Sequence, residues 1–279
     1  MPRRQRGMAL ITVLLVLALV LVSVSALLRS HQLALDSLGQ QLRAMQLRQL
    51  AEAAERHALG RLRRRETLTH AGQAWAQPQL LELAPARVRI AIEDLAGRFN
   101  LRTLARQGQL DQPTLRRWQN LRKALAIDAL APEQWQGLRL LSLDQLRVLP
   151  GVDRALLKRL QPRVALLPVT QGLNVNTVGA PLLAMLEGID EAAARQLLQQ
   201  RPEHGFPSVQ AFTAQAQAQQ LLLSGQGLAV ASNWFRLTIE VQLGEQRLYL
   251  YSEVQREEGS PTLRVVRRTL SPFEEHHLL

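Results

Sequence analysis

The feature that most constrains this chain is an uncharged, apolar stretch close to its N-terminus. It runs from Met8 to Leu28 without a charged residue or a proline. A helix rises about 1.5 Å per residue, so a stretch of this length spans the roughly 30 Å of hydrocarbon in a bilayer. Arg3, Arg4 and Arg6 precede it, and basic residues favour the cytoplasmic side. The sequence therefore predicts a transmembrane helix, with the N-terminus in the cytoplasm and the rest of the chain across the membrane.

Three kinds of processing are compatible with this segment. It is either an uncleaved anchor, or a secretory signal cut after the small residues Val24-Ser25-Ala26, or a helix that follows a short leader. The third alternative depends on Arg6-Gly7-Met8, where a basic leader ends in glycine directly before the apolar stretch. Cleavage between Gly7 and Met8 leaves the apolar helix on the mature protein, whereas cleavage by signal peptidase removes it.

The segment RQRG followed by MALITVLLVLALV resembles the leader that prepilin peptidase cuts in type IV pilins and in the pseudopilins of type II secretion systems. In that family the fifth mature residue is usually glutamate, which pairs with the α-amine of a neighbouring subunit. Here it is Thr12, which has no charge to neutralise. In lacking this glutamate, the chain resembles the minor pseudopilin K family. Members of that family stand at the filament tip, where no subunit is stacked above them. The alternative is that Thr12 is merely compatible with a membrane, because its hydroxyl can bond to its own helix.

The helical pattern continues beyond the membrane segment. No proline occurs between Pro2 and Pro78, so we expect one helix from about Met8 to about Arg65, with its second half packed on a soluble domain. The cluster Arg61 to Arg65 is interpreted as a solvated helix end, with a lipid or nucleic-acid patch as the alternative. The apolar positions Leu35, Leu38, Leu42 and Met45 recur three and four residues apart, and Leu50, Ala54 and Ala58 extend a slightly shifted stripe.

Alternating apolar residues predict four strands, at about 87–93, 233–243, 246–255 and 262–269. Turn residues separate the last three, so we expect a C-terminal meander onto which the first strand returns. About 130 residues between the first two strands are expected to be helix and loop. The predicted fold class is α+β, with a pilin-like long helix on a small antiparallel sheet and a large inserted helical domain.

The insertion contains a repeated motif. Leu149-Pro150-Gly151-Val152-Asp153 returns as Leu186-Glu187-Gly188-Ile189-Asp190, and an apolar helix follows each copy. Glycine allows a tight turn and aspartate caps the next helix, so each copy is interpreted as a helix-hairpin-helix unit. Such units often bind DNA through hairpin amides. Here Asp153 and Asp190 replace the second hairpin glycine and would repel phosphate, which disfavours nucleic acid as a partner.

Two further stretches resemble the K family, one from Glu93 to Leu101 and one from Gly172 to Thr177. We expect Gly97 to turn the chain out of the sheet. Asn174, Asn176 and Thr177 are expected to supply turn and N-cap oxygens before a helix that has Pro181 near its start.

No enzyme motif is recognisable in the sequence. The six histidines lack metal-ligand spacing, the chain has no cysteine, and neither a phosphate-binding glycine loop nor a Gly-x-Ser-x-Gly motif is present. The net charge of +11 fits acidic proteins, anionic lipid and nucleic acid equally well. The resemblance implies that calcium is possible, with Glu187, Asp190 and Glu191 as candidate ligands, but these residues could equally be caps and surface charges.

The predicted function is therefore non-enzymatic. The resemblance implies a tip subunit of the pseudopilus that associates with the I and J minor pseudopilins through Leu10, Val13, Leu14 and Leu17, after prepilin peptidase has cut the leader. The alternative is a membrane-anchored or secreted periplasmic helix-hairpin-helix protein that binds DNA. Expected domain limits are 1–7 for the leader, 8–28 for the inner-membrane helix, 29–98 for the pilin-like helix and first strand, 99–230 for the insertion and 231–279 for the last strands, all soluble parts being periplasmic.

Overall fold

The computed structural model describes residues 3–63, 69–104, 112–131, 134, 140–257 and 262–272, with side chains from residue 13 onward. The chain divides into two units, residues 1–49 and residues 50–279. The first unit consists of most of one long helix, α1 (Arg3–Leu62). Leucine, valine and alanine dominate its apolar part. The hydroxyl of Ser23 donates to the Leu19 carbonyl at 2.8 Å, so the helix satisfies its own polar group.

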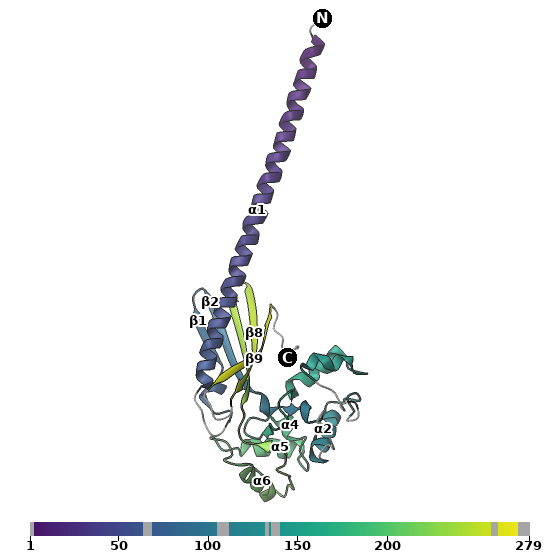
Figure 1. Ribbon diagram of the computed structural model, residues 1–279, viewed down its shortest axis with the longest axis vertical. Helices are drawn as coiled ribbons and strands as arrows, with labels where there is room; N and C mark the ends of the chain where they lie inside the picture. The colour runs from purple at the N-terminus through teal and green to yellow at the C-terminus, as the bar shows by residue number, and fades with distance from the viewer. Residues whose placement is uncertain are drawn as a thin grey trace. The chain divides into compact units, whose positions relative to one another are not determined.

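The second unit is built on a five-stranded antiparallel sheet of order β1-β2-β7-β8-β9 (Figure 1). The predicted meander is confirmed, with β2 returning to its first strand. Val88, Ile90 and Ile92 face Val241, Ile239 and Leu237 across the β2–β7 pair, which forms a continuous apolar face. The strands are β1 (Gln79–Leu83), β2 (Ala86–Asp94), β7 (Trp234–Leu243), β8 (Gln246–Arg256) and β9 (Leu263–Ser271).

The end of α1 covers this apolar face. Ala51, Ala54, Ala58 and Leu62 are buried at helical spacing, and the small alanine side chains let the helix approach the sheet closely. The guanidinium of Arg256 on β8 donates to the Leu62 carbonyl at 2.7 Å. This hydrogen bond satisfies a carbonyl at the end of the helix, where no partner within the helix is available.

The residues between β2 and β7 form the insertion, whose helices Figure 1 shows grouped beyond one end of the strands. Its core contains Trp118, which stacks on Phe99 and donates its indole N–H to the Leu130 carbonyl at 3.0 Å. Among its described residues, the helices of four residues or more are α2 (Gln112–Ala124), η5 (Leu143–Val148), α3 (Arg154–Leu160), α4 (Ala180–Leu183), α5 (Glu191–Gln199) and α6 (Val209–Ala218). In the same described part, its three-residue turns are η2 (Leu95–Gly97), η3 (Leu101–Thr103) and η6 (Gln161–Arg163), whereas the turn η1 (Ala74–Ala76) precedes β1.

The insertion is not only helix and loop, and this part of the prediction is wrong. Two short parallel pairs hold its segments together, β3 (Phe99–Asn100) with β4 (Val164–Ala165) and β5 (Leu173–Asn174) with β6 (Leu228–Ala229). Each pair has only two residues per strand, which is too short to produce a detectable alternation.

Both copies of the repeated motif form the expected tight turn. Gly151 and Gly188 have positive φ angles of 76° and 75°. Glycine adopts this conformation without steric cost. Asp153 and Asp190 cap the following helices, α3 and α5. The first helix of each unit is only about a turn or two long, as η5 and α4.

Candidate assembly surface and sheet–insertion junction

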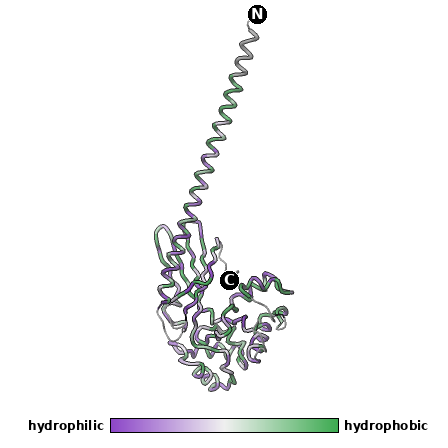
Figure 2. Tube along the Cα trace, viewed as in Figure 1, coloured by the Kyte–Doolittle hydropathy of each residue, from purple (hydrophilic) through white to green (hydrophobic). Residues whose placement is uncertain are grey.

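The apolar half of α1 lies uncovered within its own unit. Val13, Leu14 and Leu17 have 54%, 58% and 53% of their surface exposed, although a soluble protein would bury such side chains. Among the residues whose structure is described, one helix, Val13–Leu62, is long and apolar enough to cross a membrane. Figure 2 shows the continuous hydrophobic stretch in this part of the chain. The helix therefore requires lipid or other protein around it.

The remaining predicted assembly residues are Gly7, Met8, Leu10 and Thr12. They lie in the helical backbone of α1, but their side chains are outside the described part of the chain. Their roles in leader cleavage and in subunit packing stay predictions.

A buried carboxylate fixes the second half of α1 to the sheet. Glu55 is 2% exposed and accepts hydrogen bonds from the Ser252 hydroxyl at 2.6 Å and from Arg268 Nε at 2.8 Å. The hydrogen bond to Glu55 raises the pKa of Arg268 above its ordinary value. Sequence reasoning missed Glu55, although a carboxylate inside an alanine stripe signals a buried partner of opposite charge.

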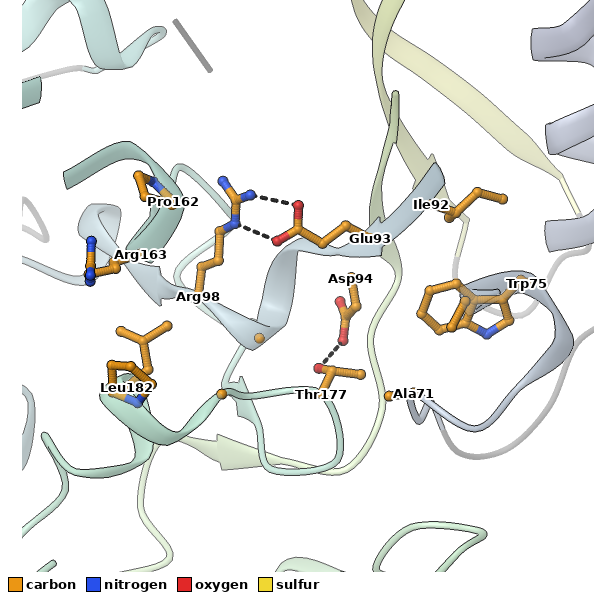
Figure 3. A pocket seen from close by; sticks show the side chains of 14 residues that line it. Ala71, Trp75, Ile92, Glu93, Asp94, Arg98, Pro162, Arg163, Thr177 and Leu182 are labelled. Carbon is orange, nitrogen blue, oxygen red and sulfur yellow. Dashed lines mark hydrogen bonds and ion pairs between the residues drawn. The ribbon is translucent and has the colours of Figure 1, made fainter. Parts of the chain in front are cut away.

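A second buried carboxylate, Asp94, stands where β2 ends and the insertion begins (Figure 3). It accepts hydrogen bonds from the Ala96 amide at 2.8 Å, from Asn174 Nδ2 at 2.8 Å and from the Thr177 hydroxyl at 2.6 Å. Burial raises the pKa of Asp94, and the hydrogen bonds from Ser232, Thr177, Ala96 and Asn174 oppose that increase. Asp94 thus joins the sheet to the second K-like stretch of the sequence.

The structure of this junction also shows why residue 97 is glycine and which residue is the N-cap of α4. A Cβ on Gly97 would lie 3.0 Å from the Thr177 hydroxyl and 3.1 Å from the Thr177 carbonyl, so glycine permits the close approach. The predicted N-cap is wrong for α4, because Gly179 occupies that position without a side-chain hydrogen bond. Asn174 does form the predicted turn by accepting from the Asn176 amide at 3.0 Å, and Pro181 does lie at the start of α4.

Charged side chains form a ladder at the same end of the sheet. Arg98 donates to both oxygens of Glu93, at 2.9 and 2.6 Å, and Arg236 and Arg267 donate to Glu253 at 3.1 and 2.6 Å. Burial raises the pKa of Glu253, but Arg267 and Arg236 outweigh it and hold the pKa below its ordinary value. Opposite charges therefore alternate over neighbouring strands.

The hairpin carboxylates of the repeated motif are used inside the fold. Asp153 accepts from the Leu156 amide and Asp190 from the Ala193 amide, both at 2.7 Å. These are helix N-terminal amides of the kind that would otherwise bind a phosphate. The geometry therefore gives no support to nucleic-acid binding by these units.

The calcium candidates are likewise engaged with protein groups. Glu187 pairs with Arg117 at 3.4 Å and Glu191 with Arg195 at 3.4 Å, while Asp190 caps α5. Over the described residues, no group of three or more histidine, aspartate or glutamate side chains could hold a metal ion. We assign no calcium ligand.

Arg61, the first member of the basic cluster, is not simply solvated as predicted. It donates to the carbonyls of Ala74 and Gln77, the latter at 3.0 Å, and so fixes the η1 turn against the end of α1. Arg64 and Arg65 lie outside the described residues.

An apolar N-terminal helix that continues onto an antiparallel sheet defines the class of membrane-anchored, pilin-like proteins. The family model described as "Type II secretion system (T2SS), protein K" matches residues 173–232. The type II secretion system protein K of Pseudomonas aeruginosa is 32% identical over 92% of this chain and 90% of its own length. That of Klebsiella pneumoniae is 29% identical over 92% of this chain and 94% of its own length.

A solved structure has the same fold. The chain is similar to one in the crystal structure of the GspK-GspI-GspJ complex from enterotoxigenic Escherichia coli, with a TM-score of 0.68, 22% identity, and coverage of 83% of this chain and 98% of that chain. Together with the sequence relatives, this places the chain in a known family. The chain belongs to the type II secretion system protein K family and is a minor pseudopilin.

Proposed function

We propose that this minor pseudopilin stands at the tip of a periplasmic pseudopilus, where it nucleates and caps assembly with the I-type and J-type minor pseudopilins. The observation that carries the proposal is the exposed apolar half of α1, which needs cover that the chain itself does not supply. The similar solved chain belongs to a complex of GspK with GspI and GspJ, which supports the same kind of partners here.

Processing of the N-terminus follows from the same role. Prepilin peptidase removes residues 1–7 by cutting between Gly7 and Met8, and residues 8–28 remain in the inner membrane. The basic residues before this helix keep the N-terminus in the cytoplasm, so the soluble part lies in the periplasm. That part consists of the pilin-like helix and first strand to residue 98, the insertion at 99–230, and the last strands at 231–279.

The tip position accounts for two departures from an ordinary pilin. A glutamate at Thr12 would need the α-amine of a subunit stacked above, and a tip subunit has no such neighbour. The insertion adds bulk between β2 and β7 that an ordinary stacked subunit would have to accommodate. Shape and burial, rather than catalysis, perform this function.

Co-purification with the I-type and J-type subunits from membranes tests the packing residues. Leu14→Arg places a charge in the middle of the apolar helix, which costs about 2.5–3.5 kcal/mol at the centre of a membrane span. We expect this variant to lose both partners. Leu38→Arg introduces the same charge at an exposed leucine of α1 outside the predicted membrane segment, and it should retain them. Retention of both partners by Leu14→Arg would contradict assembly through this helix.

Thr12→Glu tests the tip position itself. Without a stacked neighbour, the new carboxylate has no α-amine to pair with, so the variant should enter the complex less well than the original chain. Improved entry of the Thr12→Glu variant into the complex would contradict a position at the tip, because it would indicate that the α-amine of a subunit stacked above pairs with the new carboxylate.

A further inference from the structure

An open groove lies at the sheet–insertion junction, beside the residues that join the two (Figure 3). Its volume is about 460 Å³, which is within the usual range for ligand pockets. Three segments that are far apart in the sequence line it: η1 with the end of β2, the η6 turn, and the start of α4. Its apolar wall consists of Trp75, Ile92, Pro162, Pro181 and Leu182.

The acidic groups at the groove are already satisfied within the fold. Asp94 accepts from Ala96, Asn174 and Thr177, and both oxygens of Glu93 accept from Arg98. Arg98 also donates to the Gln161 carbonyl at 3.0 Å, which holds the Glu93–Arg98 pair against η6. Arg98 neutralises Glu93, and neutral N–H and O–H donors surround Asp94, so these two carboxylates of the described lining are already engaged within the fold.

The basic rim of the groove is different. Arg163 lies half-buried in the lining and donates Nη1 to the Arg159 carbonyl at 2.7 Å. Arg159, which is exposed, donates to the Leu125 carbonyl at 3.0 Å. Both partners are neutral carbonyls, and within the described part of the chain no carboxylate pairs with either guanidinium. In Figure 3, Arg163 and Trp75 lie at opposite sides of the groove.

We propose that this groove binds an extended segment of a partner protein that carries a bulky apolar side chain next to a carboxylate. The apolar side chain would pack against Trp75, as interface anchors fill pockets in other complexes. The carboxylate would meet the Arg163 guanidinium, which offers planar N–H donors suited to a bidentate contact. Because Trp75 and Arg163 lie at opposite sides of the groove, a segment that contacts both must extend across it. The proposal does not depend on a position at the tip, because the groove belongs wholly to residues 50–279.

Fluorescence anisotropy with the full chain in detergent micelles tests the groove. The probe is a fluorescein-labelled peptide that has one phenylalanine followed by two aspartates in a glycine–serine background. We expect saturable binding, weakened about tenfold or more by Arg163→Glu, because the reversed charge repels the probe. Ala71→Trp fills the groove from an exposed lining position and should abolish binding.

Matched controls separate the groove from general effects of charge and detergent. Arg154→Glu makes the same charge change at an exposed position of α3 outside the lining, and its affinity should stay within about twofold of the original. Probes in which lysines replace the aspartates, or serine replaces the phenylalanine, should bind at least about tenfold more weakly. Equal binding of the lysine probe, or equal loss in Arg154→Glu and Arg163→Glu, would overturn the proposal. Unchanged binding in Ala71→Trp would overturn it as well.

Discussion

The two ends of α1 differ in what covers their apolar side chains. Over Val13 to Leu28 the helix carries large apolar side chains that lie exposed, whereas Ala51, Ala54 and Ala58 bury a small-residue stripe against the sheet. The second stretch is stabilised by groups of its own chain, including Glu55, Ser252 and Arg268. The comparison shows that one continuous helix can depend on its surroundings at one end and be self-sufficient at the other.

Removal of the apolar N-terminal end of α1 should have the largest effect, which is on membrane association. A fragment that starts at Gln46 lacks the whole apolar segment but keeps the helix that packs on the sheet. We expect complete loss of membrane association in a flotation assay. The unfolding midpoint should stay within about 4 °C of the full chain, since less than about 1 kcal/mol of folding energy is lost. A fragment that unfolds or aggregates would show that the folded unit depends on the apolar segment.

Among the single substitutions, Asp94→Ala should lower the free energy of unfolding of the unit 50–279 the most. It leaves the Ala96 amide, Asn174 and Thr177 without their acceptor in a buried site. Each unsatisfied buried group costs about 1–3 kcal/mol, partly offset because the burial of a carboxylate is itself unfavourable, so we expect a loss of about 3 kcal/mol. Urea unfolding of the Gln46 fragment measures it.

The Asp94→Ala substitution should leave membrane attachment of the full chain unchanged. A flotation assay on the full-length variant provides that control. Detachment of the variant from membranes would show that the two ends of α1 are not independent.

Glu55→Ala is expected to have a smaller effect. Hydrogen bonds to charged groups contribute about 1.5–3 kcal/mol. The Arg268 side chain is largely exposed. Water therefore compensates the arginine for its lost partner, and we expect a loss of about 2 kcal/mol in the free energy of unfolding.

The matched control for Glu55→Ala is Glu52→Ala, which removes an exposed acid one turn earlier on the same helix. This surface substitution should change the free energy of unfolding by less than about 0.5 kcal/mol. Equal effects of the two substitutions in urea unfolding would contradict the role of Glu55 at this contact.

The smallest effect concerns pH. Because the pKa of Glu253 is held below its ordinary value in the fold, its stabilising contribution is complete above the unfolded pKa of about 4.5. The contribution is lost as pH falls through the lower folded value. Glu253→Gln should therefore flatten the decline in stability below about pH 4.5. The difference between variant and original urea midpoints from pH 7 to pH 3 isolates Glu253, because the other titrating groups are the same in both proteins. Among those groups is Asp94, whose raised pKa changes stability with pH in the opposite direction.

The elements that the sequence predicts are those with long periodic patterns. Alternation over β2, β7, β8 and β9 and the unbroken helical stretch of α1 gave the antiparallel sheet and the long helix. β1 was missed because its sequence, QLLEL, lacks β-branched residues and a clear alternation. The short parallel pairs and the Gly179 cap depend on tertiary contacts that no local pattern encodes.

The junction could be predicted only in part. The two K-like stretches marked the segments that meet there, and the repeated glycine and aspartate positions marked the hairpins of the insertion. Asp94 resembles any surface acid until the fold brings Asn174 and Thr177 to it. The alanine stripe around Glu55 does signal a buried carboxylate, but the sequence does not identify Arg268 as its partner.

In the proposed assembly, the apolar helix remains on the mature protein and holds the subunit in the pseudopilus. Mass spectrometry of the intact protein, extracted from the inner membrane of cells that contain prepilin peptidase, tests it directly. We predict a chain that begins at an N-methylated Met8. A mature chain that begins at Leu27, after removal of the apolar segment by signal peptidase, would contradict the account.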